Sequence, residues 1–558
     1  MATPHRQDNS KDLLWRAAWL WLSALGSLAC LCDAGSGSSG GDCEGLQPYE
    51  FDTGECYYCL DTGADTGATD VSWDTGDLDS WDDDAPTDAW DDDAPTDAQY
   101  DVEERDVEQD AATVMDRFGP GWPWALGLDR GYTLEDAVAD PSTNLTALSP
   151  SEMALGSRIR EPLDVRRYGA DDIQRGDTLI RNQLFELRGV MTWSPLLVVV
   201  RNDGRLLDTH VALTALGAEW VAIARPAVGY AWTAGVYSDR VTLPDELELE
   251  PTFSQQLAVV SWTEGLGAAE VHRALDSDDV ALTGLAPAID GGALLTLDQR
   301  SPNRQGLLLA TAPDGAERWR VTLDSDAVEG QVATDGQGRV YWAGRFTEAR
   351  IFPDSEERVT NGAADLFVAR LTPDGGIDWI VTLGGPGEDV LRSLVVSDAG
   401  EIALSGRFGE PFVLNLAEEP TPLTQGGAIV AFTPEGELSW TVQVEGDEGG
   451  RINDLAIGPE GRLCVTGFAQ TPRAGFTLGA HSLPAQPAQG HTGFVAILDM
   501  RRGEVLEADR LLGDDAIDGV GVSVAATSAG GCTVFGYATV HVSTTEDRSG
   551  SFLMRYQP

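Results

Sequence analysis

The feature that most constrains the fold of this chain is a pair of β-hairpins that recurs through its C-terminal two-thirds. One copy runs from Asp365 to Gly385 and reads DLFVARLTPDGGIDWIVTLGG, two short strands around a turn at Pro373–Gly376. The next stretch, SLVVSDAGEIALSGRF, reads as a second hairpin of the same kind. The first strand is almost continuously apolar, and β-branched and aromatic residues dominate the second, as is typical of buried strands. This part of the chain is therefore predicted to be all-β.

The hairpin pair has a period of about 60 residues with four short strands in each copy, which indicates a propeller, a solenoid or an array. Four antiparallel strands cannot bury both faces alone, whereas blades packed radially in a closed ring can. Counting the strands that close the second hairpin predicts seven blades, with six as the alternative. Six of these closing strands reach a glycine and the seventh, near Leu294–Leu297, does not: Gly189, Gly235, Gly344, Gly406, Gly467 and Gly536.

The last copy ends with one extra strand, SFLMRYQP, which needs a partner from elsewhere in the chain. The segment Ile159–Tyr168 could supply an outer strand and tie the two ends of the propeller together. On this hypothesis, deleting Phe552–Pro558 would lower the thermal stability of the protein.

The string LFVARLTPDGGIDWIVTLGGPGEDVLRSLVVSDAGEIALSGRF resembles the bacterial SBBP-type β-propeller repeat, which occurs in secreted and surface proteins. The resemblance is strong over Gly306–Gln470, fair over Gly493–Tyr537 and faint before Gln305. It implies a propeller in an extracytoplasmic setting. The resemblance implies no catalytic residues in this chain, because the family is recognised by its structural turns.

The N-terminus looks like an export signal. An apolar stretch of 13 residues, Ala17–Ala29, is too short for a transmembrane helix, which needs ~20, and suits a signal peptide over residues 1–29. Leu25 to Cys30 resembles a bacterial lipobox in which Cys30 is lipidated, although Ser27 departs from the usual leucine. The alternative is an ordinary cleaved signal peptide.

Residues 30–110 are predicted to form a disordered acidic tether, because charge repulsion and few branched aliphatics leave little to bury. The chain has 91 acidic and 37 basic residues and a net charge of −54, which disfavours nucleic-acid binding. The tether could associate weakly with Ca²⁺, and its Asp-Thr-Gly triplets lack the rigid hairpins of an aspartic protease. A poorly defined connector over residues 111–157 would lead to the propeller over residues 158–558.

The cysteines divide by position. Those of the tether, Cys32, Cys43, Cys56 and Cys59, would form local disulfides in an exported protein. Cys464 and Cys532 lie on closing strands of successive repeats but are offset by one position. Because strand side chains alternate between faces, they are expected to point in opposite directions and to remain unpaired thiols.

No catalytic, cofactor or metal constellation stands out. His210 and His272 fall on corresponding strands, and Gly37–Gly41 matches a nucleophile motif only within a Gly/Ser spacer. Thr372–Trp379 resembles the structural Asp-box of sialidase-type propellers. We therefore assign structural roles to the turn residues Asp314, Gly315, Asp374, Gly375, Glu435 and Gly436 and to the core tryptophans Trp319, Trp379 and Trp440.

These features favour a non-catalytic lipoprotein of the cell envelope, anchored in the outer membrane or secreted, whose propeller serves as a recognition or scaffolding module for a surface protein or glycan. The inserts Thr347–Ala364, Gly409–Gly427 and Ala469–His491 vary in length and would form the binding surface. The alternatives are an envelope enzyme that acts on polysaccharide, which needs carboxylates and an Arg or His at the central channel, and a purely structural component. The sequence does not identify the ligand.

Overall fold

The computed structural model of the chain comprises two compact units, Met1–Gln99 and Tyr100–Pro558, each considered by itself. The structure describes residues 46–50, 56–60, 125–129, 144–159, 164–168, 194–202, 206–211, 213–214, 218–226, 230–237, 240–243, 248–249, 256–264, 270–275, 280–299, 305–323, 330–416, 420–446, 449–470, 475–484, 490–512, 516–543 and 546–557. The proposed signal peptide, Cys30 and most of the tether lie outside these residues. Within this part of the chain, no helix is both long and apolar enough to span a membrane.

In the first unit the described residues form an antiparallel hairpin of β1 (Leu46–Glu50) and β2 (Cys56–Leu60). Both contain tyrosine and leucine, which favour strands, in a region otherwise rich in Asp and Gly.

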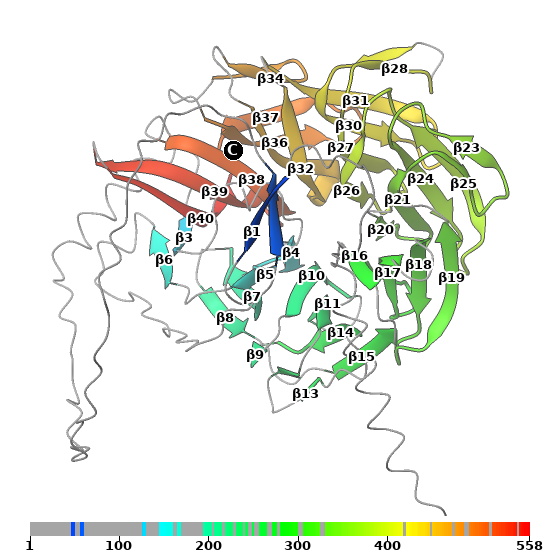
Figure 1. Cartoon of the computed structure of the whole chain (residues 1–558), viewed down its shortest axis with the longest axis horizontal. Coiled ribbons are helices and arrows are strands. Elements are labelled where there is room, and N and C mark those ends of the chain that lie inside the picture. Colours follow the sequence, from blue (N-terminus) through cyan, green and yellow to red (C-terminus); the bar gives the residue numbers. More distant parts are fainter. Residues whose placement is uncertain are drawn as a thin grey trace, which may run out of the picture. The chain divides into compact units, whose positions relative to one another are not determined.

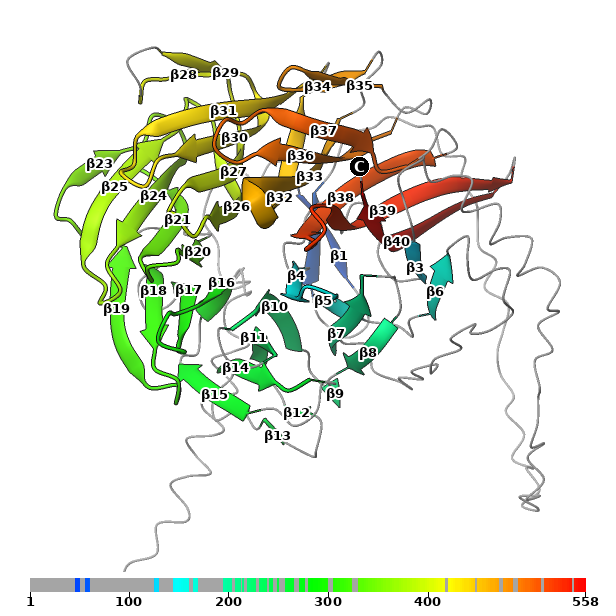
Figure 2. The ribbon, with the colours of Figure 1, turned by 180° about the vertical axis from the view of Figure 1, so that it is seen from behind.

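The second unit is a ring of seven antiparallel sheets around a common centre (Figure 1; Figure 2). The predicted seven-bladed β-propeller is thus confirmed. In order from the innermost strand outward, the blades are as follows: blade 1, β4 (Asn144–Ser149), β5 (Glu152–Ile159), β7 (Ser194–Arg201) and β8 (Leu206–Val211); blade 2, β10 (Ala218–Ala224), β11 (Ala231–Tyr237), β14 (Gln256–Trp262) and β15 (Glu270–Leu275); blade 3, β16 (Val280–Pro287), β17 (Ala293–Gln299), β18 (Gln305–Thr311) and β19 (Glu317–Leu323); blade 4, β20 (Gln331–Thr334), β21 (Val340–Phe346), β24 (Asp365–Leu371) and β25 (Ile377–Leu383); blade 5, β26 (Val390–Val396), β27 (Ile402–Phe408), β30 (Gly426–Phe432) and β31 (Leu438–Glu445); blade 6, β32 (Gly450–Ile457), β33 (Arg462–Ala469), β36 (Thr492–Asp499) and β37 (Val505–Arg510); blade 7, β38 (Ala516–Ala526), β39 (Cys532–Ser543), β40 (Glu546–Tyr556), β3 (Ala125–Asp129) and β6 (Asp164–Tyr168).

Short strands lie between the blade strands, and a 3-10 turn, η2 (Pro459–Gly461), joins β32 to β33. The short strands are β9 (Leu213–Thr214), β12 (Val241–Thr242), β13 (Glu248–Leu249), β22 (Ala349–Ile351), β23 (Glu357–Val359), β28 (Phe412–Leu414), β29 (Thr421–Leu423), β34 (Phe476–Leu478) and β35 (His481–Leu483).

Both faces of a blade are buried, because each packs against a neighbouring blade. On β21, Trp342 packs with the apolar residues of blade 3, whereas its neighbour Tyr341 packs with those of blade 5. Both side chains are at most 1% exposed. This two-sided burial explains why the strands read as nearly continuous apolar runs and not as alternating ones.

The tight turns within the blades need glycine at one position. In the turn from Thr372 to Gly376, Gly375 has φ +86°, and its N–H donates to the carbonyl of Thr372. Gly400 has the equivalent role, with φ +89°, in the turn that joins β26 to β27. A positive φ at such a glycine, two residues before the second strand, is the geometry of a hairpin loop that ends in a bulge.

The ring begins earlier in the chain than residue 158, the boundary expected from the repeats. β4 and β5 form the inner half of blade 1, so the first closing strand is β5 and not a strand near Gly189, which lies outside the described residues. The connector expected over residues 111–157 therefore contributes blade strands.

The ring closes between the two ends of the second unit. β40 pairs with β3, as Ala125↔Met554 and Leu128↔Ser551, and β3 pairs in turn with β6 (Figure 1; Figure 2). The predicted partner segment, Ile159–Tyr168, therefore provides the outermost strand, and the direct neighbour of β40 is β3. The sequence of β3, ALGLD, is mostly apolar, and the sequence of β6, DVRRY, is mostly charged, as suits a sheet edge.

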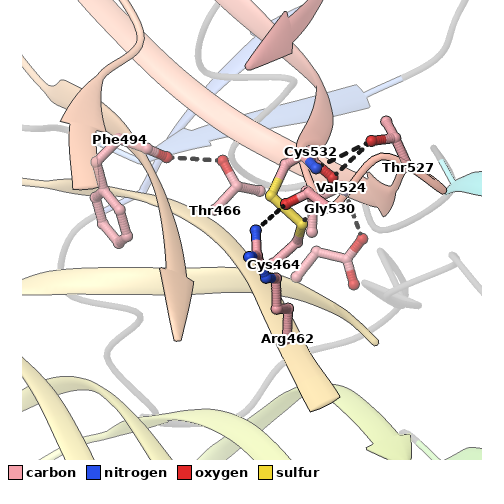
Figure 3. Close-up of a disulfide and its surroundings, with 10 residues drawn as sticks. Arg462, Cys464, Thr466, Phe494, Val524, Thr527, Gly530 and Cys532 are labelled. Atoms are coloured by element: carbon pink, nitrogen blue, oxygen red, sulfur yellow. Dashed lines mark hydrogen bonds between the residues drawn. A yellow bond between two sulfur atoms is a disulfide. The ribbon is translucent and has the colours of Figure 1, made fainter. Parts of the chain in front are cut away.

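Cys464 and Cys532 form a disulfide between blades 6 and 7, so the prediction of two separate thiols is wrong (Figure 3). Side chains at equivalent positions of two consecutive blades point in the same direction around the ring and do not meet. A disulfide between blades 6 and 7 therefore needs one side chain on the face of blade 6 that packs against blade 7 and one on the facing side of blade 7. The one-residue offset provides this arrangement. Cys464 packs with Ile497 of its own blade and Cys532 with Val534, all in the cluster between the two blades.

Candidate functional site

The propeller is a disc with two faces, called ends here, and the loops at these two ends differ chemically. At one end, which we call the turn end, the tight turns join first to second and third to fourth strands. At the other, the insert end, first and third strands begin and the inserts fold into β22–β23, β28–β29 and β34–β35. Figure 2 shows the last two of these hairpins at the outer edge of the ring. The insert end therefore carries the variable part of the fold.

The predicted binding inserts also have a packing role. Phe352 of the first insert and Leu414 of the second lie in the apolar clusters between blades, each 2% exposed. β34 of the third insert pairs with β31 and extends the sheet of blade 5. Outward-facing residues remain, of which Val359 is 65% and Val413 50% exposed. Among the described residues of the inserts, these outward-facing side chains are the ones available to a ligand.

Three arginines of blades 5 and 6, Arg392, Arg407 and Arg451, gather at the insert end and are called here the arginine cluster. Arg392 occupies a β-bulge of the innermost strand β26, between Leu391 and Ser393. Arg407 lies near the end of β27, and Arg451 lies near the start of β32. Bulges often re-aim a side chain beside a functional site.

Arg451 lies in an electrostatically unfavourable position. Burial and, to a smaller extent, the neighbouring charges of Arg392 and Arg407 together lower the pKa of Arg451 to about 10. Among the residues that the structure describes, neither Arg407 nor Arg451 forms an ion pair. The guanidinium of Arg451 lies 5.6 Å from the ring centroid of Phe468, which holds it in place. Planar guanidinium groups in this situation are suited to bind a carboxylate, sulfate or phosphate group.

A histidine and a carboxylate also lie beside Phe468. The ring of His491 packs edge-to-face on Phe468, with centroids 4.8 Å apart. The backbone N–H of His491 donates to Asp518 Oδ1 at 2.7 Å, and the Nδ1 atom lies 3.1 Å from the same oxygen. Asp518 thus fixes the imidazole against blade 7 and limits the orientation of the ring.

A hydrogen-bonded network joins the innermost strands of blades 5, 6, 7 and 1 around buried Asp454. Its Oδ1 accepts from Ser393 Oγ at 2.9 Å, and its Oδ2 accepts from Ser523 Oγ at 2.7 Å and from the N–H of Val524 at 2.9 Å. Ser523 Oγ also accepts from the N–H of Leu145. Burial raises the pKa of Asp454. With both oxygens already bonded within the protein, this carboxyl group joins blades and is not placed to act on a substrate.

The predicted turn residues and tryptophans form a repeated contact between blades, called here the tryptophan latch. The indole N–H of Trp319 donates to the carbonyl of Pro373 at 3.0 Å, and that of Trp379 donates to Pro434 at 3.2 Å. Trp440 makes the same contact with Met500 at 2.9 Å. In each case the acceptor lies in the turn between the third and fourth strands of the next blade.

The glycine of each latch turn makes room for the indole ring. A methyl group on Gly375 would lie 2.8 Å from Trp319, and one on Gly436 would lie 3.0 Å from Trp379. Asp314 closes its own turn, where its Oδ1 accepts from the N–H of Ala316 at 3.1 Å. These tryptophans therefore lie against protein, at the turn end, and not in a row that faces the insert end.

The remaining candidates from the sequence do not assemble into a site. Gly37–Gly41 lies outside the described residues. His210 and His272 lie on β8 and β15, the outermost strands of blades 1 and 2. Within the described ranges, no three His, Cys, Asp or Glu side chains converge as metal ligands. The arginine cluster, which repeat matching did not indicate, is the strongest functional feature.

No protein-family model and no curated protein sequence matches the chain. Among solved structures, Sqt1 from Chaetomium thermophilum, bound to the N-terminus of ribosomal protein L10, has a TM-score of 0.39 at 11% identity and covers 75% of this chain and 98% of its own. The β-propeller domain of the trilobed protease from Pyrococcus furiosus, described as having an open velcro topology, gives 0.35 at 7% identity, over 73% and 97%. A Bacteroides caccae protein of unknown function gives 0.29 at 12% identity, over 57% and 93%. These likenesses concern the fold and do not bear on a ligand.

Proposed function

We propose that the protein is a non-catalytic recognition module of the cell envelope that binds an anionic group of its partner at the arginine cluster. The observation that carries the proposal is the arginine cluster itself: three cations of adjacent blades, one of them with a pKa lowered to about 10 by burial and by its neighbours. A bound carboxylate or sulfate would relieve this repulsion and form charge-assisted hydrogen bonds.

The charge of the whole chain narrows the choice of partner. A net charge of −54 repels long polyanions, whereas a local cluster of three arginines attracts a short segment of a partner that carries a few acidic groups. Surface glycans that contain uronic acids and proteins that present an exposed acidic residue have this property. Nucleic acid does not.

The envelope location rests on the N-terminal sequence and on the disulfide. Lipidation of Cys30 would anchor the chain, and the acidic tether would hold the propeller away from the membrane. The bond between Cys464 and Cys532 supports an oxidising compartment, since structural disulfides are rare in reducing ones. The resemblance to SBBP-type repeats agrees with this setting but stays a prediction.

Calorimetric titration of the full-length protein with trigalacturonate tests the proposal, with galactotriose as the uncharged comparison. We expect trigalacturonate to bind and galactotriose not to. A double variant, Arg407→Gln with Arg451→Gln, should weaken binding by at least about tenfold, because charge-assisted hydrogen bonds contribute roughly 1.5–3 kcal/mol each.

The matched control is Arg320→Gln with Arg501→Gln. These arginines form exposed ion pairs with Glu317 and Glu401, so the control removes the same total charge away from the arginine cluster. It should bind trigalacturonate as the wild type does. Equal losses in the two double variants would reduce the effect to net charge and refute a site at the arginine cluster. A second titration, with an acidic peptide, distinguishes a protein partner from a glycan.

A further inference from the structure

Two buried carboxyl groups meet at the insert end between blades 4 and 5 and are called here the acid pair. Asp365 begins β24 and is 1% exposed, and Asp389 precedes β26 and is fully buried. Asp389 Oδ2 accepts from the N–H of Gly385 at 2.8 Å, and its Oδ1 accepts from the N–H of Gly409 at 3.0 Å. Asp389 therefore joins two loops of the seam.

One oxygen of the acid pair has no protein partner. Asp365 Oδ2 accepts from the backbone N–H of Asn361 at 2.9 Å, whereas Asp365 Oδ1 is buried without a hydrogen bond. A methyl group on Gly384 would lie 2.5 Å from this Oδ1 and 2.7 Å from Asp389 Oδ2, so the two oxygens are at most about 5 Å apart. A buried acceptor without a protein partner, so close to a second carboxyl group, calls for a hydrogen-bond donor or a cation.

Two further groups that could each supply an oxygen ligand to a cation lie beside the acid pair. The side-chain amide nitrogen of Asn361 lies 3.3 Å from Asp365 Oδ2 and 3.2 Å from the carbonyl oxygen of Gly384. In this orientation the nitrogen donates to both oxygens. A bound cation would favour a rotation of the amide by half a turn, which places the amide oxygen where the nitrogen now lies. Two carboxylates, a backbone carbonyl and, after this rotation, an amide oxygen then lie together around Gly384.

The next seam shows that the fold does not need the acid pair. Between blades 5 and 6, Gly426 corresponds to Asp365 and Gly450 corresponds to Asp389 in the strand registers. Their backbones pack directly, since a methyl group on Gly426 would lie 3.3 Å from the nitrogen of Gly450. The same junction thus closes without any carboxyl group, and the acid pair calls for a separate explanation.

We propose that the acid pair binds one Ca²⁺ ion, with Asp365 and Asp389 as carboxylate ligands and with Asn361 Oδ1, the Gly384 carbonyl and water as the remaining ligands. Ca²⁺ prefers six to eight oxygen donors of this mixed kind and tolerates irregular geometry. The ion would join the loop before β24, the connection from blade 4 to blade 5 and, through Asp389, the end of β27. The inference is independent of the anion site at the arginine cluster.

Calcium titration of the full-length protein by calorimetry tests the proposal. We expect one saturable site per chain above the shallow background of the acidic tether. The midpoint of thermal unfolding should rise by at least about 2 °C in 1 mM CaCl₂ relative to EGTA, because a ligand that binds only the folded state stabilises it. In the variant Asp365→Asn the saturable site should disappear while the background remains.

Two further variants separate a calcium site from a general effect of charge. Asp378→Asn removes an exposed carboxylate of the same blade, which pairs with Arg370, and should keep the site. Asn361→Ala leaves both carboxylates and should weaken calcium binding several-fold. Identical titrations of the wild type and Asp365→Asn would overturn the proposal, as would an equal thermal shift with MgCl₂ or no difference between CaCl₂ and EGTA.

Discussion

Removal of the disulfide between blades 6 and 7 should lower the free energy of unfolding by about 4 kcal/mol. The bond closes a loop over a sequence separation of 68 residues, and loop-closure entropy for that length gives this magnitude. Cys464 is 1% exposed and Cys532 is fully buried, so the variant Cys464→Ala with Cys532→Ala should also lose a little packing. Urea denaturation followed by tryptophan fluorescence measures the total loss.

Reduction of the wild type separates the bond from the packing, because dithiothreitol breaks the disulfide and leaves both sulfur atoms in place. The reduced wild type should lose most of the 4 kcal/mol, and the double variant should not respond to dithiothreitol. Non-reducing peptide mapping should recover one linked peptide that contains Cys464 and Cys532. If the linked peptide is present but reduction costs less than about 1 kcal/mol, the entropic reasoning is refuted. If the peptide is absent, the pairing is refuted.

Two other predictions concern contacts between blades. Trp379→Phe removes the indole donor to Pro434 and should lower the free energy of unfolding by about 1–2 kcal/mol, as read from the calorimetric unfolding transition; an unchanged transition would contradict the tryptophan latch. Burial raises the pKa of Asp454, so the folded protein binds this proton more tightly than the unfolded chain and gains stability as the pH falls towards 4. The free energy of unfolding of the wild type minus that of Asp454→Asn should therefore decrease as the pH rises. Urea titrations at pH 4.5, 6 and 8 measure this difference, and a difference that is constant or increases with pH would contradict the assignment.

The blades from β7 onward could be predicted because their hairpins combine apolar strands with turns that need glycine or Asp. Blade 1 could not be placed correctly, for two physical reasons. β4 and β5 are joined by a turn of Pro150 and Ser151, which lacks the glycine signal of the later blades. Residues 160–193 then separate β5 from β7, so the period of about 60 residues breaks at that point.

The arginine cluster could not be predicted by aligning repeats, because its members occupy positions that do not correspond. Arg392 lies in a bulge, Arg407 follows the closing glycine of β27, and Arg451 corresponds to Val390 of the preceding blade. Only one signal was visible beforehand: Arg345 and Arg407 both follow a closing glycine. Of these two, Arg345 has a carboxylate partner, Glu388, at 2.8 Å.

The backbone geometry repeats from blade to blade, so positions where the side chains depart from the repeat are the candidates for ligand binding. Three consecutive seams have the same strand geometry but different polar groups. The seam between blades 4 and 5 holds the acid pair, the seam between blades 5 and 6 replaces it with Gly426 and Gly450 and adds the arginine cluster, and the seam between blades 6 and 7 carries the disulfide. Because the strands alone close each seam, a buried charge at one of them is not required by the fold. Its cost in desolvation is explained if a cation or an anion binds there.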